Sequence, residues 1–126
     1  MKCFISYNYV IIHILPPIKY ITILHIFILP YLIVSRQQKI TFDGRHFFID
    51  LVFYNYILKC FVIIDLKLGD LTHQDLGQMQ MYVNYYTREM MNDGDNPPIG
   101  IVLCADKSEQ IVKYTLPEEN TQIFVS

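Results

Sequence analysis

The strongest constraint on the fold is a change of sequence periodicity near residue 70. Three runs rich in aromatic and β-branched residues come before it and predict β-strands: RQQKITF, RHFFIDLVFY and LKCFVIIDLKLG. Asp43-Gly44 separates the first two runs and predicts a tight hairpin turn, because both residues tolerate a positive φ angle. After residue 71 the apolar residues recur at helical spacing. The pattern therefore predicts a hairpin, a third strand and a packed helix.

The helix is predicted in THQDLGQMQMYVNYYTREMM. Thr72 suits the N-cap and Asp75 the first turn, where a carboxylate interacts favourably with the helix dipole. An apolar stripe expected to face the core follows at steps of three and four: Leu76, Met79, Val83, Tyr86 and Met90. Further strands are expected in IGIVLC and EQIVKYTL, and QIFVS is expected to be a last edge fragment. The predicted fold class is an α/β mixed sheet in the order β-β-β-α-β-β, with one long helix packed on it.

Residues 1–34 form an apolar segment that permits three interpretations. Pro16-Pro17 and Pro30 interrupt it and leave only residues 18–29 between them, fewer than the roughly 20 that a membrane helix needs. The segment is a membrane anchor, a buried apolar part of the domain, or non-native sequence translated ahead of the true reading frame. Residues 1–40 contain no Asp or Glu, which favours the last interpretation. The predicted domains are accordingly this segment, 1–34, and a folded unit, 35–126.

Composition excludes several classes of protein. A chain that is 52 % hydrophobic and 17 % charged is too apolar to be intrinsically disordered. Residues 41–126 carry six basic and twelve acidic residues, a net charge of −6, so bulk electrostatics do not favour nucleic acid. Gly-rich phosphate loops, nucleophile elbows and zinc-ligand spacings are absent from the sequence. The three cysteines lack a CxxC pair and fit a reducing, cytoplasmic location.

Two acidic residues lie inside apolar strands, Asp50 in FFIDLVF and Asp65 in FVIIDLKL. A buried carboxylate is costly unless it is paired, protonated or bound to a cation. If the two strands are neighbours, both carboxylates converge, and Lys67 projects from the same face as Asp65 because residues i and i+2 share a face. Such a cluster suits Mg²⁺, with Lys67 aligning the attacking water or stabilising the phosphorus centre. A buried Asp–Lys ion pair, or an Asp ending each strand, is the alternative.

The surroundings of these acids resemble a known family. FFIDLVFYN, CFVIIDLKLGDL, and GQMQMYVNYY followed by DNPPIGIVLC resemble, in this order, the YhcG-type domain of the PD-(D/E)XK nuclease superfamily. The resemblance covers about residues 36–126 and implies a restriction-endonuclease-like fold and cleavage of DNA phosphodiesters with Mg²⁺ or Mn²⁺. It implies that Asp50 is the acid of the second core strand and that Asp65 and Lys67 form the (D/E)XK pair. Gln78 and Tyr82 match polar helix positions over the site, and Gln78 is expected to assist catalysis, with a solvent-facing polar residue as the alternative.

The chain departs from that family near its N-terminus. The superfamily usually carries a further metal-binding Glu on a helix before the first core strand, and residues 1–40 offer no acid for this position. The C-terminal end is also short relative to the family, so the resemblance predicts a domain cut short at both ends. Three functions follow: a metal-dependent nuclease or a fragment of one, a non-catalytic module that binds nucleic acid or a protein, or a small membrane-anchored protein.

Expected partners follow from the basic and aromatic residues near the site. Arg36, Lys39 and Arg45 flank the first hairpin and are expected to contact DNA phosphates, with a solvated basic hairpin as the alternative. Tyr82 is expected either to stack on nucleic acid or to pack in the core. DNA is the expected partner, a second copy of the chain or a partner protein stays open, and a membrane is expected only through residues 1–34.

Overall fold

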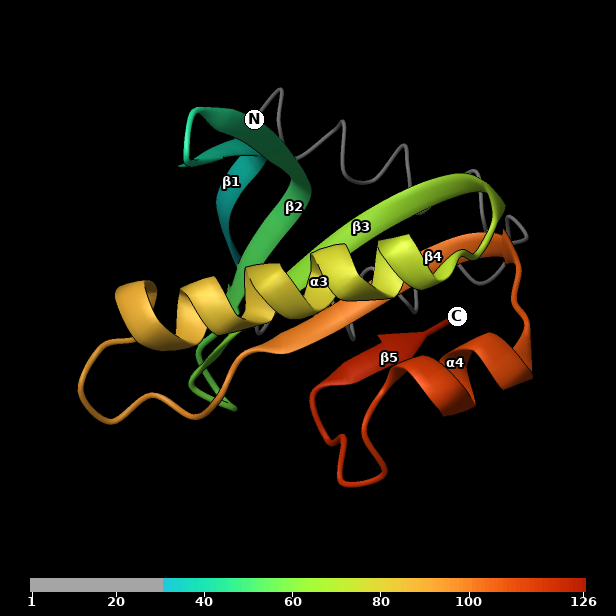
Figure 1. The fold of residues 1–126 in the computed structure, drawn as a ribbon. Coiled ribbons are helices and arrows are strands. Elements are labelled where there is room, and N and C mark those ends of the chain that lie inside the picture. The colour runs from blue at the N-terminus through green and yellow to red at the C-terminus, as the bar shows by residue number, and fades with distance from the viewer. Residues whose placement is uncertain (1–30) are drawn as a thin grey trace, which may run out of the picture.

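The computed structural model describes residues 31–126, which form a five-stranded mixed sheet with helices against it (Figure 1). The strands lie side by side in chain order. The first two pairs are antiparallel, and the last two are parallel. The strands are β1 (Tyr31–Phe42), β2 (Arg45–Asn55), β3 (Cys60–Asp70), β4 (Ile99–Asp106) and β5 (Ile123–Val125).

The predicted β1–β2 hairpin is confirmed. Asp43 and Gly44 connect the two strands with φ angles of 49° and 75°, the left-handed conformation that a two-residue hairpin turn requires. β1 begins at Tyr31, so the boundary expected after residue 34 falls inside this strand. The apolar run hides that start, because strand residues 32–34 are as apolar as those before them. The rest of the apolar segment, 1–30, lies outside the described residues. Within 31–126, no helix is long and apolar enough to cross a membrane.

The predicted helix is α3 (His73–Tyr85), which continues as a π-helical turn, η2 (Tyr86–Met90). Thr72 is the N-cap, as predicted, and forms a capping box with Asp75. The apolar stripe is buried as predicted as far as Tyr86, but the expectation for Met90 is wrong, since 39 % of its surface is exposed. The reason is the π-turn: Met91 N donates to Tyr86 O at 3.0 Å, a five-residue step that rotates the last residues away from the helical stripe.

Helix α3 lies across one face of the sheet (Figure 1) and approaches β4 most closely at Gly100. A Cβ atom at position 100 would lie 2.6 Å from Met79 Sδ and 2.9 Å from Val83 Cγ2. The absence of a side chain therefore lets the helix pack against the strand. The fully buried side chains of Leu76 and Val102 belong to the same core.

The strand expected in EQIVKYTL is wrong, because this segment forms helix α4 (Glu109–Thr115). Ser108 caps it, with its hydroxyl accepting a hydrogen bond from Ile111 N at 3.3 Å. The apolar residues of so short a segment fit either periodicity. The parallel pairing of β4 with β5 decides the outcome, because two parallel strands need a crossover connection, which is usually helical. The element order is therefore β-β-β-α-β-α-β.

Candidate active site

The two predicted acids lie where strands β2 and β3 separate. The β2–β3 ladder ends at the pair Leu51–Ile64, so Asp50 and Asp65 occupy the next opposing positions without pairing their backbones. Beyond this point β2 continues along β1, and β3 continues along β4, and Figure 1 shows the hairpin rising away from the other strands. Opposing positions of antiparallel strands share a face. The fork therefore brings the two carboxyl groups together, as the sequence predicts.

Asp65 is buried, with only 3 % of its surface exposed. Its Oδ2 atom is buried and accepts no hydrogen bond from any described residue. The Nζ atom of Lys67 lies 3.1 Å from this oxygen and forms an ion pair with it. The same ammonium lies 3.4 Å from Asp75 Oδ1 at the start of α3. Lys67 thus bridges an acid of the sheet and an acid of the helix.

Asp50 is held at both of its carboxylate oxygens. Leu66 N donates to Oδ2 at 2.8 Å, replacing the backbone acceptor that β3 loses where the ladder ends. Gln37 Nε2 donates to Oδ1 at 2.9 Å from strand β1. Each carboxylate oxygen has two lone pairs, so these bonds leave Asp50 with capacity for a further ligand.

The electrostatics of the site raise the pKa of Asp65 and keep Lys67 charged. Burial, and then hydrogen bonding and charge from the neighbouring carboxyl of Asp50, raise the pKa of Asp65 from 3.8 to about 6, although Lys67 opposes the shift. Burial alone would lower the pKa of Lys67, but the carboxylates of Asp65 and Asp75 outweigh it and hold this pKa above its ordinary value. Lys67 is therefore a cation at neutral pH.

Helix α3 presents three polar residues at steps of three and four, a spacing that puts them on one face. Asp75 contacts Lys67, and the hydroxyl of Tyr82 donates to Phe48 O at 3.4 Å on β2. Burial, together with the charges of Asp65 and Asp50, raises the pKa of Tyr82. Gln78 is half-buried and lies between Asp75 and Tyr82 on this face. The helix therefore lies against the fork at Asp75 and Tyr82, and the role of Gln78 stays a prediction.

The four residues predicted to contact DNA differ in their exposure to solvent. Arg36 and Lys39 on β1 and Arg45 at the start of β2 are exposed, so the structure places all three on the surface of the hairpin. The ring of Tyr82 has no exposed surface. A base cannot stack on a ring without a free face, so this burial agrees with the packing alternative for Tyr82 and does not fit a nucleic-acid contact.

The donor set fits a hard divalent cation held by few protein ligands. Across residues 31–126, no group of three or more His, Cys, Asp or Glu side chains is placed to hold a metal ion. Two carboxylates still suffice for Mg²⁺, which usually keeps several waters and binds substrate phosphate. The buried Oδ2 of Asp65, which within residues 31–126 accepts no hydrogen bond and is paired with the Lys67 ammonium, is an oxygen ligand of the required kind. The residues present therefore fit such an ion.

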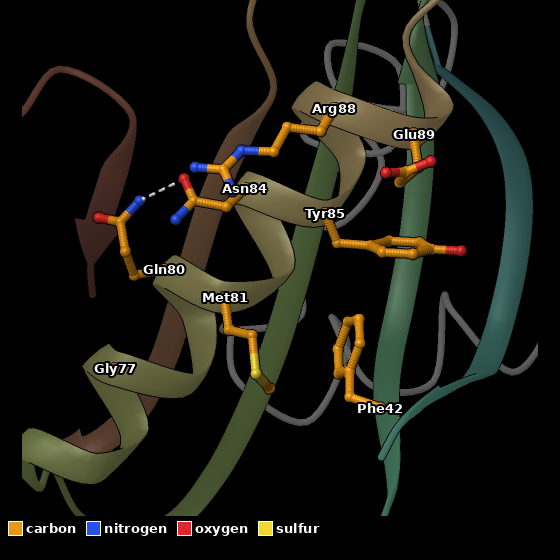
Figure 2. A pocket seen from close by; sticks show the side chains of 8 residues that line it. All are labelled: Phe42, Gly77, Gln80, Met81, Asn84, Tyr85, Arg88 and Glu89. Carbon is orange, nitrogen blue, oxygen red and sulfur yellow. Dashed lines mark hydrogen bonds between the residues drawn. The ribbon is translucent and has the colours of Figure 1, made fainter. Parts of the chain in front are cut away.

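A hollow of about 420 Å³ on another face of α3 contains none of the predicted site residues (Figure 2). Phe42 of β1 and Tyr85 meet edge to face along one side, with ring centroids 5.6 Å apart. Gln80 Nε2 donates to Asn84 Oδ1 at 3.1 Å on the opposite side. The aromatic contact joins the hairpin tip to the helix, so this hollow is a feature of packing beside the site.

Two residues of the site were not predicted from the sequence. Asp75 was expected only as a helix-capping acid, yet it also pairs with Lys67. Its position in the first turn after the strand of Lys67 is a usable signal, because a helix that folds back on its strand brings these residues together. Gln37 contacts Asp50 from β1 and carried no signal, since Arg36, Gln37 and Gln38 look alike as strand residues.

Comparisons with known proteins show which family the chain matches. The sequence model of the family described as YhcG PDDEXK nuclease domain matches residues 23–126. The putative nuclease YhcG of Escherichia coli (strain K12) is 42 % identical over 83 residues, which are 66 % of this chain and 22 % of that protein. The chain thus spans about a fifth of this relative's length.

Two solved structures share the fold. A repair endonuclease from Pyrococcus abyssi superposes with a TM-score of 0.54 at 19 % identity, over 82 % of this chain and 42 % of that one. A complex of EndoMS with double-stranded DNA gives a TM-score of 0.55 at 14 % identity, over 78 % and 37 % of the two chains. The restriction-endonuclease-like fold class is therefore confirmed, apart from the segment that forms α4.

Proposed function

This chain belongs to the YhcG PDDEXK nuclease domain family, and from that premise we propose that it hydrolyses DNA phosphodiester bonds with Mg²⁺ or Mn²⁺. Asp50 and Asp65 would hold the ion. The observation that carries the proposal is the pair of carboxyl groups at the fork, one of which has a buried oxygen whose partner among the described residues is the Lys67 ammonium. DNA as the substrate is supported by the DNA complex of a protein with the same fold.

A bound divalent cation would neutralise charge on the phosphate and lower the pKa of a coordinated water. The residues of this chain supply the rest. The Asp50 carboxylate is oriented by Leu66 N. The ammonium of Lys67, held by Asp65 and Asp75, provides a fixed positive charge for the negative charge that develops on the phosphate. Gln78, on the helix face over the fork, supplies an amide that can hydrogen-bond the substrate.

The test is calorimetric titration of Mn²⁺ into the full chain, combined with cleavage of plasmid, single-stranded and branched DNA in Mg²⁺. Asp65→Ala is expected to lose both Mn²⁺ binding and cleavage. Lys67→Ala is expected to retain Mn²⁺ binding and lose about 100-fold or more in cleavage rate, the usual effect of removing one charge-stabilising group. Asp70→Ala and Lys107→Ala, exposed acidic and basic controls, are expected to resemble wild type. Undiminished cleavage in both site variants would refute the assignment.

A non-catalytic module is the second candidate, and one observation favours it. Among the described residues, the fork offers two acids and no third ligand of the His, Cys, Asp or Glu type. A chain that binds DNA but shows no cleavage in Mg²⁺ or Mn²⁺, and no Mn²⁺ binding that depends on Asp65, would establish this alternative.

A cytoplasmic location fits both candidates, because Cys60 and Cys104 are free thiols.

A further inference from the structure

Gln37 has an unusual backbone for a residue within a β-strand. Its φ angle is 50°, in the left-handed region that favours glycine and that opposes a side chain with a Cβ atom. The β1–β2 ladder pairs Arg36 with Leu51 and Gln38 with Ile49, so Gln37 lies opposite Asp50 without joining the register. Strained conformations of this kind persist where the surrounding structure requires them, often at functional sites.

The side chain of Gln37 explains what this conformation achieves. Its Nε2 atom donates to Asp50 Oδ1 at 2.9 Å. With Leu66 N on Oδ2, the carboxylate is held from a strand on either side, β1 through a side chain and β3 through a backbone amide. Two donors from different strands fix both the position and the rotation of the Asp50 carboxyl group, whereas one donor would leave it free to rotate.

We propose that Gln37 is a positioning residue of the site: its amide clamps Asp50 so that the carboxylate is presented to a divalent cation shared with Asp65. This inference rests on the proposed function, because it gives Gln37 a role toward the same ion. Hydrogen-bond partners of metal-binding carboxylates typically change metal affinity by about 10-fold to 100-fold when removed. Gln37 is exposed, so the lower end of this range is expected.

The experiment measures Mn²⁺ affinity by calorimetry, and the unfolding midpoint without metal, on the full chain. Gln37→Gly removes the amide and relieves the left-handed backbone, and Gln37→Met removes the amide while keeping a side chain of similar length. Both variants are expected to bind Mn²⁺ about 10-fold more weakly. The midpoint of the Gly variant is expected to equal or exceed that of wild type. Asp43→Gly, at the φ of 49° in the turn of the same hairpin, is the matched control and should leave Mn²⁺ affinity unchanged.

Each outcome decides the matter. Wild-type Mn²⁺ affinity in either Gln37 variant would overturn the role of the amide. If the Gly variant binds Mn²⁺ more weakly and also has a lowered unfolding midpoint, Gln37 contributes to the fold alone. This result would also overturn the role of the amide. If wild type shows no Mn²⁺ binding that depends on Asp65, the proposed function and this inference are both refuted. The first two results leave the proposed function standing.

Discussion

Asp65→Asn tests whether burial of this carboxyl group makes the stability of the metal-free protein depend on pH. In the folded chain its pKa is raised from 3.8 to about 6, chiefly by burial and then by Asp50. The unfolded chain therefore releases this proton at lower pH than the folded chain. The stabilising contribution of Asp65 is complete below about pH 3.8 and is lost as the pH rises through about 6.

The size of this effect follows from the shift. A difference of about 2 pKa units corresponds to about 3 kcal/mol of unfolding free energy, at about 1.4 kcal/mol per unit. The free energy applies without a large correction for solvent, because Asp65 is almost fully buried. Relative to Asp65→Asn, wild type should lose about this much stability across the window. The Asn side chain does not titrate, so the comparison reports the titration of Asp65 together with its coupling to Asp50 and Lys67.

Urea unfolding in EDTA at intervals between about pH 4 and about pH 7.5 measures this difference, since most of the change falls in that range. Asp43→Asn, at an exposed acidic position in the hairpin turn, should give a curve parallel to that of wild type. If the curves of wild type and Asp65→Asn are also parallel, the folded-state pKa of Asp65 is not raised and the argument from its burial is refuted.

Two further predictions test the packing of the helix and the surface of the hairpin. Gly100→Ala should lower the free energy of unfolding by about 1 to 3 kcal/mol, because the new methyl group would overlap Met79 and Val83; an unchanged urea midpoint would contradict the close approach of helix and strand. The double variant Arg36→Ala/Lys39→Ala should weaken DNA binding and reduce the slope of log affinity against log salt concentration by about 2, because each removed cation leaves one phosphate without its neutralising partner. Fluorescence anisotropy measures this slope, and an unchanged slope would exclude a phosphate interaction at both positions.

The sequence predicted those elements in which local chemistry and long-range packing agree. The Asp43-Gly44 turn and the Thr72 cap each depend on one or two residues whose preferences the fold satisfies. The segment 109–115 failed because its local pattern is ambiguous and its structure follows from the parallel pairing of β4 and β5, which no local pattern encodes. The prediction that Met90 is buried failed for a similar reason, since the π-turn changes the helical period after Tyr86.

For the site, the sequence predicted the two acids but not the separation of the strands, at which the Asp50 carboxylate takes the place of a backbone acceptor. A backbone pair between Asp50 and Asp65 would extend the β2–β3 ladder by one step. The ladder instead ends there, and the Asp50 carboxylate accepts the hydrogen bond of Leu66 N in place of a backbone carbonyl. A carboxylate thus satisfies the backbone amide that the end of the pairing exposes. An acid within an apolar strand can therefore indicate where a sheet opens, as well as which residues act there.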